Sequence, residues 1–314
     1  MATRELSAME PWQLRRVVVW IRSFRVRIAL AMLSIVIVVG FLYSWPRRGA
    51  FAIRRAGGMV WSEEDAAWAD RLGRPASLNH ILWMGYLRAD DSLNVVDLST
   101  SHSLTNPLSG IQSFPNLKYL TVNGRQLDQS VDDLRGEFRS LEWVTVHSAG
   151  DRQLTRLTRF PNLSFIDLNK PIAIDLGIDS LKNLGVIQIR ECANLANCLK
   201  QIGRLPHVQR LHFHLCTGFS DDDLSFLIGL HSLKFLQFDE CTRIGDVGLR
   251  HLSEIEGLNT LSLPMSLGEI SEEGVQTLAS FRRLRSLNIS KSQLRPEQIK
   301  TLTERLTGRR LMVD

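Results

Sequence analysis

Three side chains of the kinds that bind zinc lie at short spacing in the second half of the sequence. His212 and His214 are separated by one residue, and Asp239 follows His214 by 25 residues. On a β-strand two such histidines face the same side, because successive side chains alternate between the two faces. Two imidazoles and a carboxylate are ligands that Zn²⁺ accepts, but a fourth ligand is not evident. We therefore weigh a metal-dependent site against plain polar surface, and we favour polar surface with no metal bound.

The four cysteines form a second group that could carry chemistry. Cys192, Cys216 and Cys241 follow one another at intervals of 24 and 25 residues, whereas Cys198 breaks this spacing. In an exported protein an even number of cysteines is compatible with disulfide bonds, and a bridge between Cys192 and Cys198 is one alternative. The regular spacing favours the other alternative, in which the cysteines are free thiols that point into a core one above another.

Other catalytic signatures are absent from the sequence. It contains no G-x-S-x-G, no H-E-x-x-H, no phosphate-binding loop and no C-x-x-C. The pair Gly57-Gly58 is not part of a G-x-G-x-x-G motif, so it does not indicate a phosphate site. We therefore predict that the protein is not an enzyme and binds no cofactor.

The elements that position these residues follow from a repeat. The pattern L-x-x-L-x-L, with other aliphatic residues or Phe allowed at the apolar positions, begins at Leu93, Leu117, Leu141, Leu163, Leu184, Val208, Leu233, Leu258 and Leu284. The starts are 21 to 26 residues apart, which is the period of leucine-rich repeats. The alternating half of each repeat predicts a short strand, and the segment after it has helical spacing. Ser220, Ser271 and Pro296 are predicted helix starts.

One such repeat cannot bury its apolar face alone, so stacking must form a continuous core. The predicted fold is therefore an α/β leucine-rich-repeat solenoid, with a curved parallel sheet on the concave side and helices on the convex side. We also expect a strand at residues 59–61, in a cap before the first repeat, and a last strand or cap at residues 311–313.

Two resemblances add to this prediction. Cys192, Cys216 and Cys241 stand three residues after the third apolar position of their repeats, where L-x-x-L-x-L-x-x-N/C repeats have Asn or Cys. This resembles the cysteine-containing, ribonuclease-inhibitor-like class of leucine-rich repeats, and the resemblance implies protein binding along the concave face. The stretch Ile53–Val60 after an apolar segment also resembles a family of bacterial membrane-anchored leucine-rich-repeat proteins. Ubiquitin-ligase recruitment, implied only by the repeat subtype, fits poorly with an anchor at the N-terminus.

The strands should present three rows of side chains away from the core. The position before the second apolar residue gives Val95, Tyr119, Trp143, Phe165, Val186, Arg210, Phe235, Thr260 and Ser286. The next outward position gives Asp97, Thr121, Thr145, Asp167, Gln188, His212, Gln237, Ser262 and Asn288. The third gives Ser99, Asn123, His147, Asn169, Arg190, His214, Asp239, Pro264 and Ser290. Aromatic and arginine side chains in such rows are typical of binding hot spots, although aromatics also simply fit a pleated sheet.

The apolar segment Ile28–Trp45 is predicted to be a single transmembrane helix. Its 18 residues carry no charge, and a helix of that length spans about 27 Å, close to the roughly 30 Å of a bilayer core. The alternative is a signal peptide cleaved at the small-residue site Ala50-Phe51-Ala52. Against it, the region before the apolar segment is long, and Arg47 and Arg48 precede that site. Six arginines precede the segment and four follow it closely, so the positive-inside rule favours a cytoplasmic N-terminus and an extracytoplasmic repeat domain.

Charge separates the two parts of the chain. Residues 1–55 contain ten arginines and two glutamates, whereas residues 56–314 contain 28 basic and 31 acidic side chains. A nearly neutral main domain argues against nucleic-acid binding. The predicted organisation is a basic tail at 1–27, a membrane helix at 28–45, a juxtamembrane segment and cap at 46–92, and about nine repeats with a C-terminal cap at 93–314.

We therefore expect a membrane-tethered protein-binding module that works through its concave face. The residues predicted to contact the protein partner are Tyr119, Trp143, His147, Phe165, Arg190, Arg210, His212, His214, Phe235 and Asp239. One alternative is a structural spacer or a component of an envelope assembly. A less favoured alternative is a metal-dependent enzyme that uses His212, His214 and Asp239.

Overall fold

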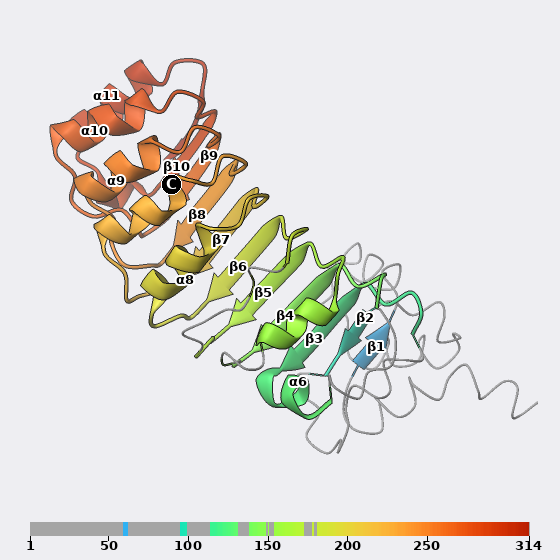
Figure 1. Ribbon diagram of the computed structural model, residues 1–314. Helices are drawn as coiled ribbons and strands as arrows, with labels where there is room; N and C mark the ends of the chain where they lie inside the picture. The colour runs from blue at the N-terminus through green and yellow to red at the C-terminus, as the bar shows by residue number, and fades with distance from the viewer. Residues whose placement is uncertain are drawn as a thin grey trace, which may run out of the picture. The chain divides into compact units, whose positions relative to one another are not determined.

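The computed structural model describes residues 59–61, 95–98, 114–130, 138–148, 150, 154–172, 178 and 181–313. Within these residues, eleven strands form one sheet in which the strands follow one another in chain order (Figure 1). Strands β2 to β11 run parallel, and β1 pairs antiparallel with β2. The strands are β1 (Met59–Trp61), β2 (Val95–Asp97), β3 (Tyr119–Asn123), β4 (Trp143–His147), β5 (Phe165–Asn169), β6 (Val186–Arg190), β7 (Arg210–His214), β8 (Phe235–Asp239), β9 (Thr260–Leu263), β10 (Ser286–Ile289) and β11 (Arg310–Val313).

The strand prediction is confirmed. Each of the nine strands β2 to β10 starts two residues after the first apolar position of one of the nine repeats. The strand expected at residues 59–61 is β1, and the strand expected near the C-terminus is β11. The architecture of residues 95–313 is therefore that of a leucine-rich-repeat solenoid.

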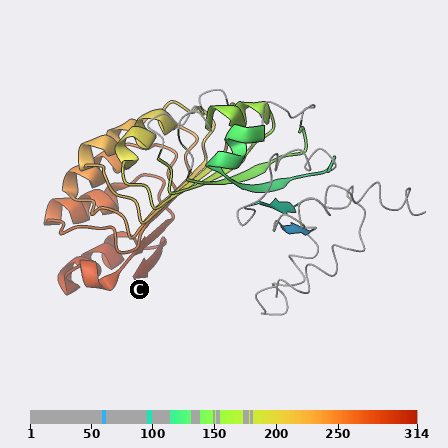
Figure 2. The same ribbon diagram turned by 90° about the horizontal axis from the view of Figure 1, so that it is seen from below.

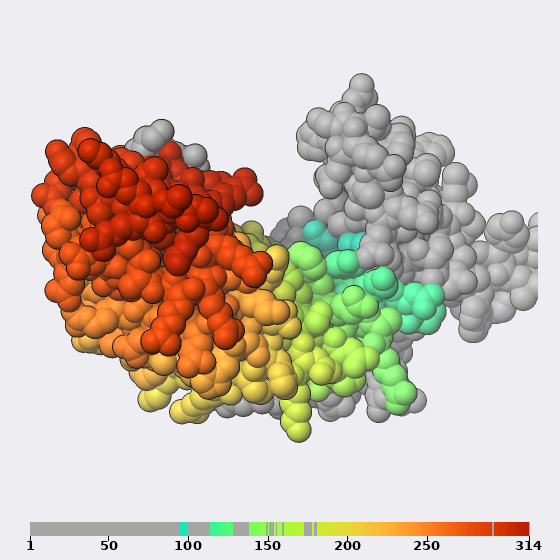
Figure 3. Space-filling model, turned by 90° about the horizontal axis from the view of Figure 1, so that it is seen from above, coloured from blue at the N-terminus to red at the C-terminus, as the bar shows by residue number. Residues whose placement is uncertain are grey.

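The helical connections lie on one side of the sheet, on the outer side of its bend (Figure 2). They are α6 (Gly124–Ser130), η5 (Thr155–Arg159), α8 (Leu195–Ile202), η6 (Asp221–Leu227), α9 (Asp246–Ser253), α10 (Glu272–Ser280), η7 (Lys291–Gln293) and α11 (Pro296–Arg305), where η marks a 3-10 helix. All three predicted helix starts are confirmed. Ser271 Oγ accepts hydrogen bonds from the amides of Glu273 and Gly274, and Ser220 precedes η6. The space-filling view shows the repeats in contact from green to red (Figure 3).

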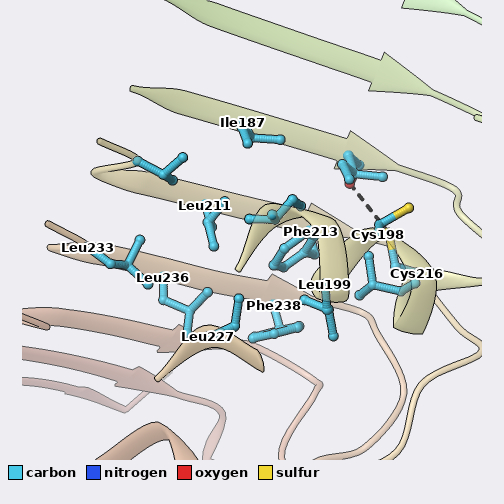
Figure 4. Packing of buried hydrophobic residues seen from close by; sticks show 14 of the residues in the cluster. Ile187, Cys198, Leu199, Leu211, Phe213, Cys216, Leu227, Leu233, Leu236 and Phe238 are labelled. Carbon is cyan, nitrogen blue, oxygen red and sulfur yellow. Dashed lines mark hydrogen bonds between the residues drawn. The ribbon is translucent and has the colours of Figure 1, made fainter. Parts of the chain in front are cut away.

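The core lies between the sheet and the helices. Phe213 and Phe238 on neighbouring strands pack with ring centroids 4.9 Å apart, among leucines from both layers (Figure 4). The regularly spaced Cys192, Cys216 and Cys241 are buried, as predicted. The amide of Cys216 donates to Cys241 Sγ at 3.4 Å, and the amide of Cys241 donates to Ser266 Oγ at 2.8 Å. A side chain of the next repeat therefore satisfies the turn amide of each of these repeats.

Carboxylates on the helical side join successive repeats in a similar way. Asp221 accepts hydrogen bonds from the amide of Gly245, and Asp246 accepts hydrogen bonds from the amide of Ser271. The carboxylate of Asp246 lies so close to Gly274 that a Cβ on that glycine would be 2.0 Å from Oδ1. Glycine at this position therefore leaves room for the carboxylate of the preceding repeat in its place on the Ser271 amide.

The backbone turns sharply after each strand from β4 to β9. The residue that follows the third outward row has a positive φ of 50–59° in six successive repeats, namely Ser148, Lys170, Glu191, Leu215, Glu240 and Met265. In the first five, the amide donates to a carbonyl of the next repeat at 2.8–3.1 Å. Since none of these residues is glycine, the inter-repeat hydrogen bonds hold a conformation that costs about 1–2 kcal/mol for an ordinary L-residue.

No helix among the described residues is long and apolar enough to cross a membrane. The predicted tail at 1–27, the predicted membrane helix at 28–45 and the region 46–92, apart from β1, lie outside those residues.

Candidate functional site

The candidate site is the face of the sheet opposite the helices, which we call the open face. On β3, β4, β6, β7 and β8 the side chains alternate between buried core positions and half-buried or exposed positions on this face, whereas Asp167 on β5 and Ser262 on β9 are buried. Strand pairing places equivalent residues of successive repeats directly opposite one another, so the three predicted rows run across the sheet. All ten predicted site residues lie in these rows.

The first row starts with three aromatic side chains, which we call the aromatic ridge: Tyr119 on β3, Trp143 on β4 and Phe165 on β5. The rings of Trp143 and Phe165 are stacked, with centroids 3.7 Å apart and an angle of 21° between planes. The ring of Tyr119 is tilted by 50° against Trp143 at 5.6 Å. Trp143 Nε1 also lies 3.3 Å from Thr145 Oγ1, to which it donates a hydrogen bond. Because the rings contact one another, a molecule approaching from solvent meets chiefly their edges.

The first row continues beyond the ridge with Val186 on β6, Arg210 on β7 and Phe235 on β8. The guanidinium carbon of Arg210 lies 5.4 Å from the centroid of the Phe235 ring, within cation–π distance. Arg210 is exposed, and the described residues contain no carboxylate in an ion pair with it. With strands about 4.8 Å apart, the row from Tyr119 to Phe235 is about 24 Å long.

An ion pair joins the second and third outward rows near the middle of the sheet. Arg190 on β6 donates hydrogen bonds through Nε and Nη2 to the two carboxylate oxygens of Asp167 on β5, with 3.1 Å between Nε and Oδ1. Asp167 belongs to the second outward row and is not one of the predicted site residues, and it is only 6% exposed. Its position diagonal to Arg190 on the next strand is the signal that could have identified this pair. The guanidinium of Arg190 is therefore neutralised within the protein.

The described structure does not bring His212, His214 and Asp239 together as a group of three that could hold a metal ion. His214 Nε2 lies 3.9 Å from Asp239 Oδ2, and the paired strands place the two residues opposite one another. His212 Nε2 is buried and has no hydrogen-bond partner among the described residues. Burial lowers the pKa of His212 from 6.5, with Asp239 acting in the opposite direction. The described part of the chain contains no group of three or more His, Cys, Asp or Glu that could hold a metal ion, so the metal-dependent alternative gains no support.

The four cysteines are buried free thiols and lie outside the open face. The sulfur atoms of Cys192 and Cys198 are 4.0 Å apart. Their hydrogen bond lowers the pKa of Cys192 to about 7, and it acts together with burial to raise the pKa of Cys198. The cysteines thus belong to the packing of the repeats.

Comparison with protein-family models and with curated proteins gives no match. Among solved structures, the chain is similar to an internalin (inlF) from Listeria monocytogenes str. 4b F2365, with 16% identity, a TM-score of 0.39, and coverage of 65% of this chain and 69% of that chain. It is also similar to an internalin C2 (inlC2) from the same strain, with 17% identity, a TM-score of 0.37, and coverage of 71% of this chain and 80% of that chain. At such identities the likeness concerns the fold alone.

Proposed function

We propose that this protein is a membrane-tethered recognition module that binds a protein partner along the first row of its open face. The observation that carries the proposal is the unbroken row Tyr119, Trp143, Phe165, Val186, Arg210 and Phe235, which runs across six strands. Tyr, Trp and Arg are the residue types that dominate binding energy in protein interfaces.

The chemistry of the row favours a polypeptide over a sugar polymer. A sugar ring stacks on an aromatic ring whose flat face is free, but the stacking of Trp143 on Phe165 covers one face of each ring, and Tyr119 lies tilted against Trp143. Their exposed edges offer an apolar ridge of the kind that side chains of a protein partner cover. The length of about 24 Å corresponds to roughly seven residues of extended polypeptide at about 3.3 Å each.

The two arginines of the open face have different roles in this proposal. Arg190 already pairs with the nearly buried Asp167, so it contributes shape and rigidity. Arg210 is exposed and has an aromatic ring as its neighbour. A carboxylate of the partner is the group that Arg210 would bind best, because the fixed fork of guanidinium donors matches carboxylate geometry.

The tether is the segment Ile28–Trp45, and the proposal places the repeats outside the cytoplasm. The sequence supports both points through 18 uncharged residues and through the excess of arginine before them. Protease protection of the repeats in sealed, right-side-out membrane preparations tests the orientation. Protection there would contradict an extracytoplasmic domain.

The binding test is affinity capture from cross-linked native membranes with the full-length chain. The bait variant is Trp143→Ala/Arg210→Ala, and the matched control is Thr260→Ala/Ser286→Ala, which alters the same row beyond Phe235. A partner lost with the first variant and retained with the control would support the proposal and provide a ligand for affinity measurement. Recovery of the same partners with both variants would contradict it, and the spacer alternative would then become the better account.

A further inference from the structure

The C-terminal repeats carry an unusual separation of charge. Residues 221–273 contain eleven Asp and Glu against three Lys and Arg, whereas residues 281–314 contain nine Lys and Arg against three Asp and Glu. The two groups nearly cancel, which is why the average charge of the domain is close to neutral.

The basic group gathers at the edge of the sheet where strands begin, which we call the basic edge. Arg282, Arg283 and Arg285 occupy the loop that leads into β10, and Arg309 and Arg310 occupy the equivalent place at β11. Strand pairing sets Ser286 opposite Arg310, and the amide of Arg310 donates to the carbonyl of Arg285 at 2.7 Å, so the two loops are neighbours. All except Arg309 are exposed, and among the described residues no ion pair neutralises any of the five.

Nine of the eleven acidic residues lie at the opposite edge, where strands end and helices begin, which we call the acidic edge; Glu254 and Glu256 lie between α9 and β9, at the strand-start edge. Asp222 lies in the first turn of η6, Glu240 directly follows β8, and Glu269 lies in the loop before α10. All three side chains are exposed. Because each helix returns antiparallel to its strand, helix starts and strand starts lie on opposite edges of the solenoid.

Helix dipoles explain only one of these groups. Carboxylates at helix N-termini are stabilised by the dipole, which accounts for much of the acidic edge. Arg282, Arg283, Arg285 and Arg309 lie in loops beyond the helices, Arg310 begins β11, and α10 has no basic residue in its last turn. Clustering five guanidinium groups that form no ion pair with a described residue is unfavourable in an isolated chain, so the basic edge indicates an anionic partner.

We propose that this partner is the acidic edge of a second copy of the chain, so that copies associate side by side through Arg282, Arg283 and Arg285 of one and Asp222, Glu240 and Glu269 of the next. An anionic lipid surface would engage the basic edge alone and would leave the acidic edge without a role. A second copy engages both. Because the two edges lie on opposite sides of one body, the contact is head to tail and does not close into a dimer. Each added copy leaves a free edge for the next.

Sedimentation velocity of the full chain in detergent micelles tests this proposal. The basic-edge variant is Arg282→Gln/Arg283→Gln/Arg285→Gln, and the acidic-edge variant is Asp222→Asn/Glu240→Gln/Glu269→Gln. The matched control is Arg125→Gln/Lys200→Gln/Lys300→Gln, which removes three exposed positive charges from the helices α6, α8 and α11. At low salt we expect the mass of the wild-type protein and of the control to rise steadily with concentration. Raising the salt to about 0.5 M should abolish the rise, because screening shortens the reach of exposed charges.

The two edge variants give the sharpest result when they are mixed. Each keeps one intact edge, so each alone should stay monomeric, while an equimolar mixture should form a one-to-one complex and stop there. The proposal is overturned if the wild-type chain stays monomeric at low salt, or if either variant alone still associates like wild type. It is also overturned if a monomeric wild-type chain instead binds vesicles containing anionic lipid and the basic-edge variant does not.

Discussion

Replacing Arg190 by alanine should destabilise the protein more than replacing its partner Asp167. The carboxylate of Asp167 is the less accessible half of the pair, with 9% of its side chain exposed against 32% for Arg190. In Arg190→Ala the nearly buried carboxylate loses both charged hydrogen bonds. In Asp167→Ala the guanidinium that remains is long, flexible and one-third exposed, so it can turn towards water.

The magnitudes follow from this asymmetry. Leaving one partner of a fully buried pair uncompensated costs roughly 3–5 kcal/mol, and partial exposure reduces this to about 3 kcal/mol for Arg190→Ala. Asp167→Ala removes a charge-assisted hydrogen bond, but water then solvates the guanidinium that donated it. The free energy of unfolding should therefore fall by only about 1 kcal/mol. The double variant has no orphaned charge, so the second substitution should return about 1–2 kcal/mol of the stability lost in Arg190→Ala.

Urea unfolding of the full chain followed by circular dichroism measures these differences. Thr260→Ala, on the same face but remote from the pair, is the control and should change the free energy of unfolding by less than about 0.5 kcal/mol. The reasoning is refuted if the two single substitutions cost the same, or if the double variant is less stable than Arg190→Ala. Either result would mean that water already solvates the Asp167 carboxylate.

Three further outcomes are expected from the same unfolding assay. Gly274→Ala should cost about 1–2 kcal/mol, because its Cβ would lie 2.0 Å from Asp246 Oδ1 and displace that carboxylate from the Ser271 amide. In an Asp246→Ala background the cost should be smaller, since only the 2.9 Å approach to Ile270 Cβ remains; an equal cost in both backgrounds would contradict this explanation. Leu215→Asn should raise the free energy of unfolding by about 1 kcal/mol, since Asn tolerates the φ of 53° better than leucine, and no gain would show that this turn is unstrained. Burial lowers the pKa of His212 below its unfolded value of 6.5, so the unfolded chain binds more protons and stability should fall as the pH drops through 6.5. His212→Gln should flatten this part of the pH profile, and an unchanged profile would assign it to other groups.

The repeat pattern was sufficient to predict the strands and the rows that they display. Apolar residues at fixed places specify which side of each strand is buried, and equal spacing specifies which residues become neighbours. Trp143 therefore had to lie between Tyr119 and Phe165, and the structure confirms it. The burial of Asp167 could not be read from alternation, because it depends on a long side chain of the next strand folding over it.

The turns after the strands carried a weaker signal. Leu215 and Met265 are not turn formers, and the positive φ at these places comes from the surrounding repeats rather than from the residue type. The separation of charge was present in the sequence but vanished in a sum over residues 56–314. It emerges when residues 221–273 and 281–314 are counted separately, but the assignment of the charges to the strand-start and strand-end edges requires the fold. The tail, the membrane helix and the orientation remain predictions from the sequence.

The ion pair also decides which arginine is the better probe of binding. A loss of partner capture in Arg190→Ala would have two explanations. Either a contact with the partner is lost, or the orphaned Asp167 carboxylate destabilises the sheet that carries the first row. Arg210 is exposed and stands over Phe235, so its removal leaves no buried charge behind. Arg210→Ala should therefore leave the free energy of unfolding within about 1 kcal/mol of wild type, the scale of one exposed cation–π contact. A capture defect in a variant that passes this stability test would be attributable to the open face itself, and a large loss of stability would show that Arg210 belongs to the packing of the sheet.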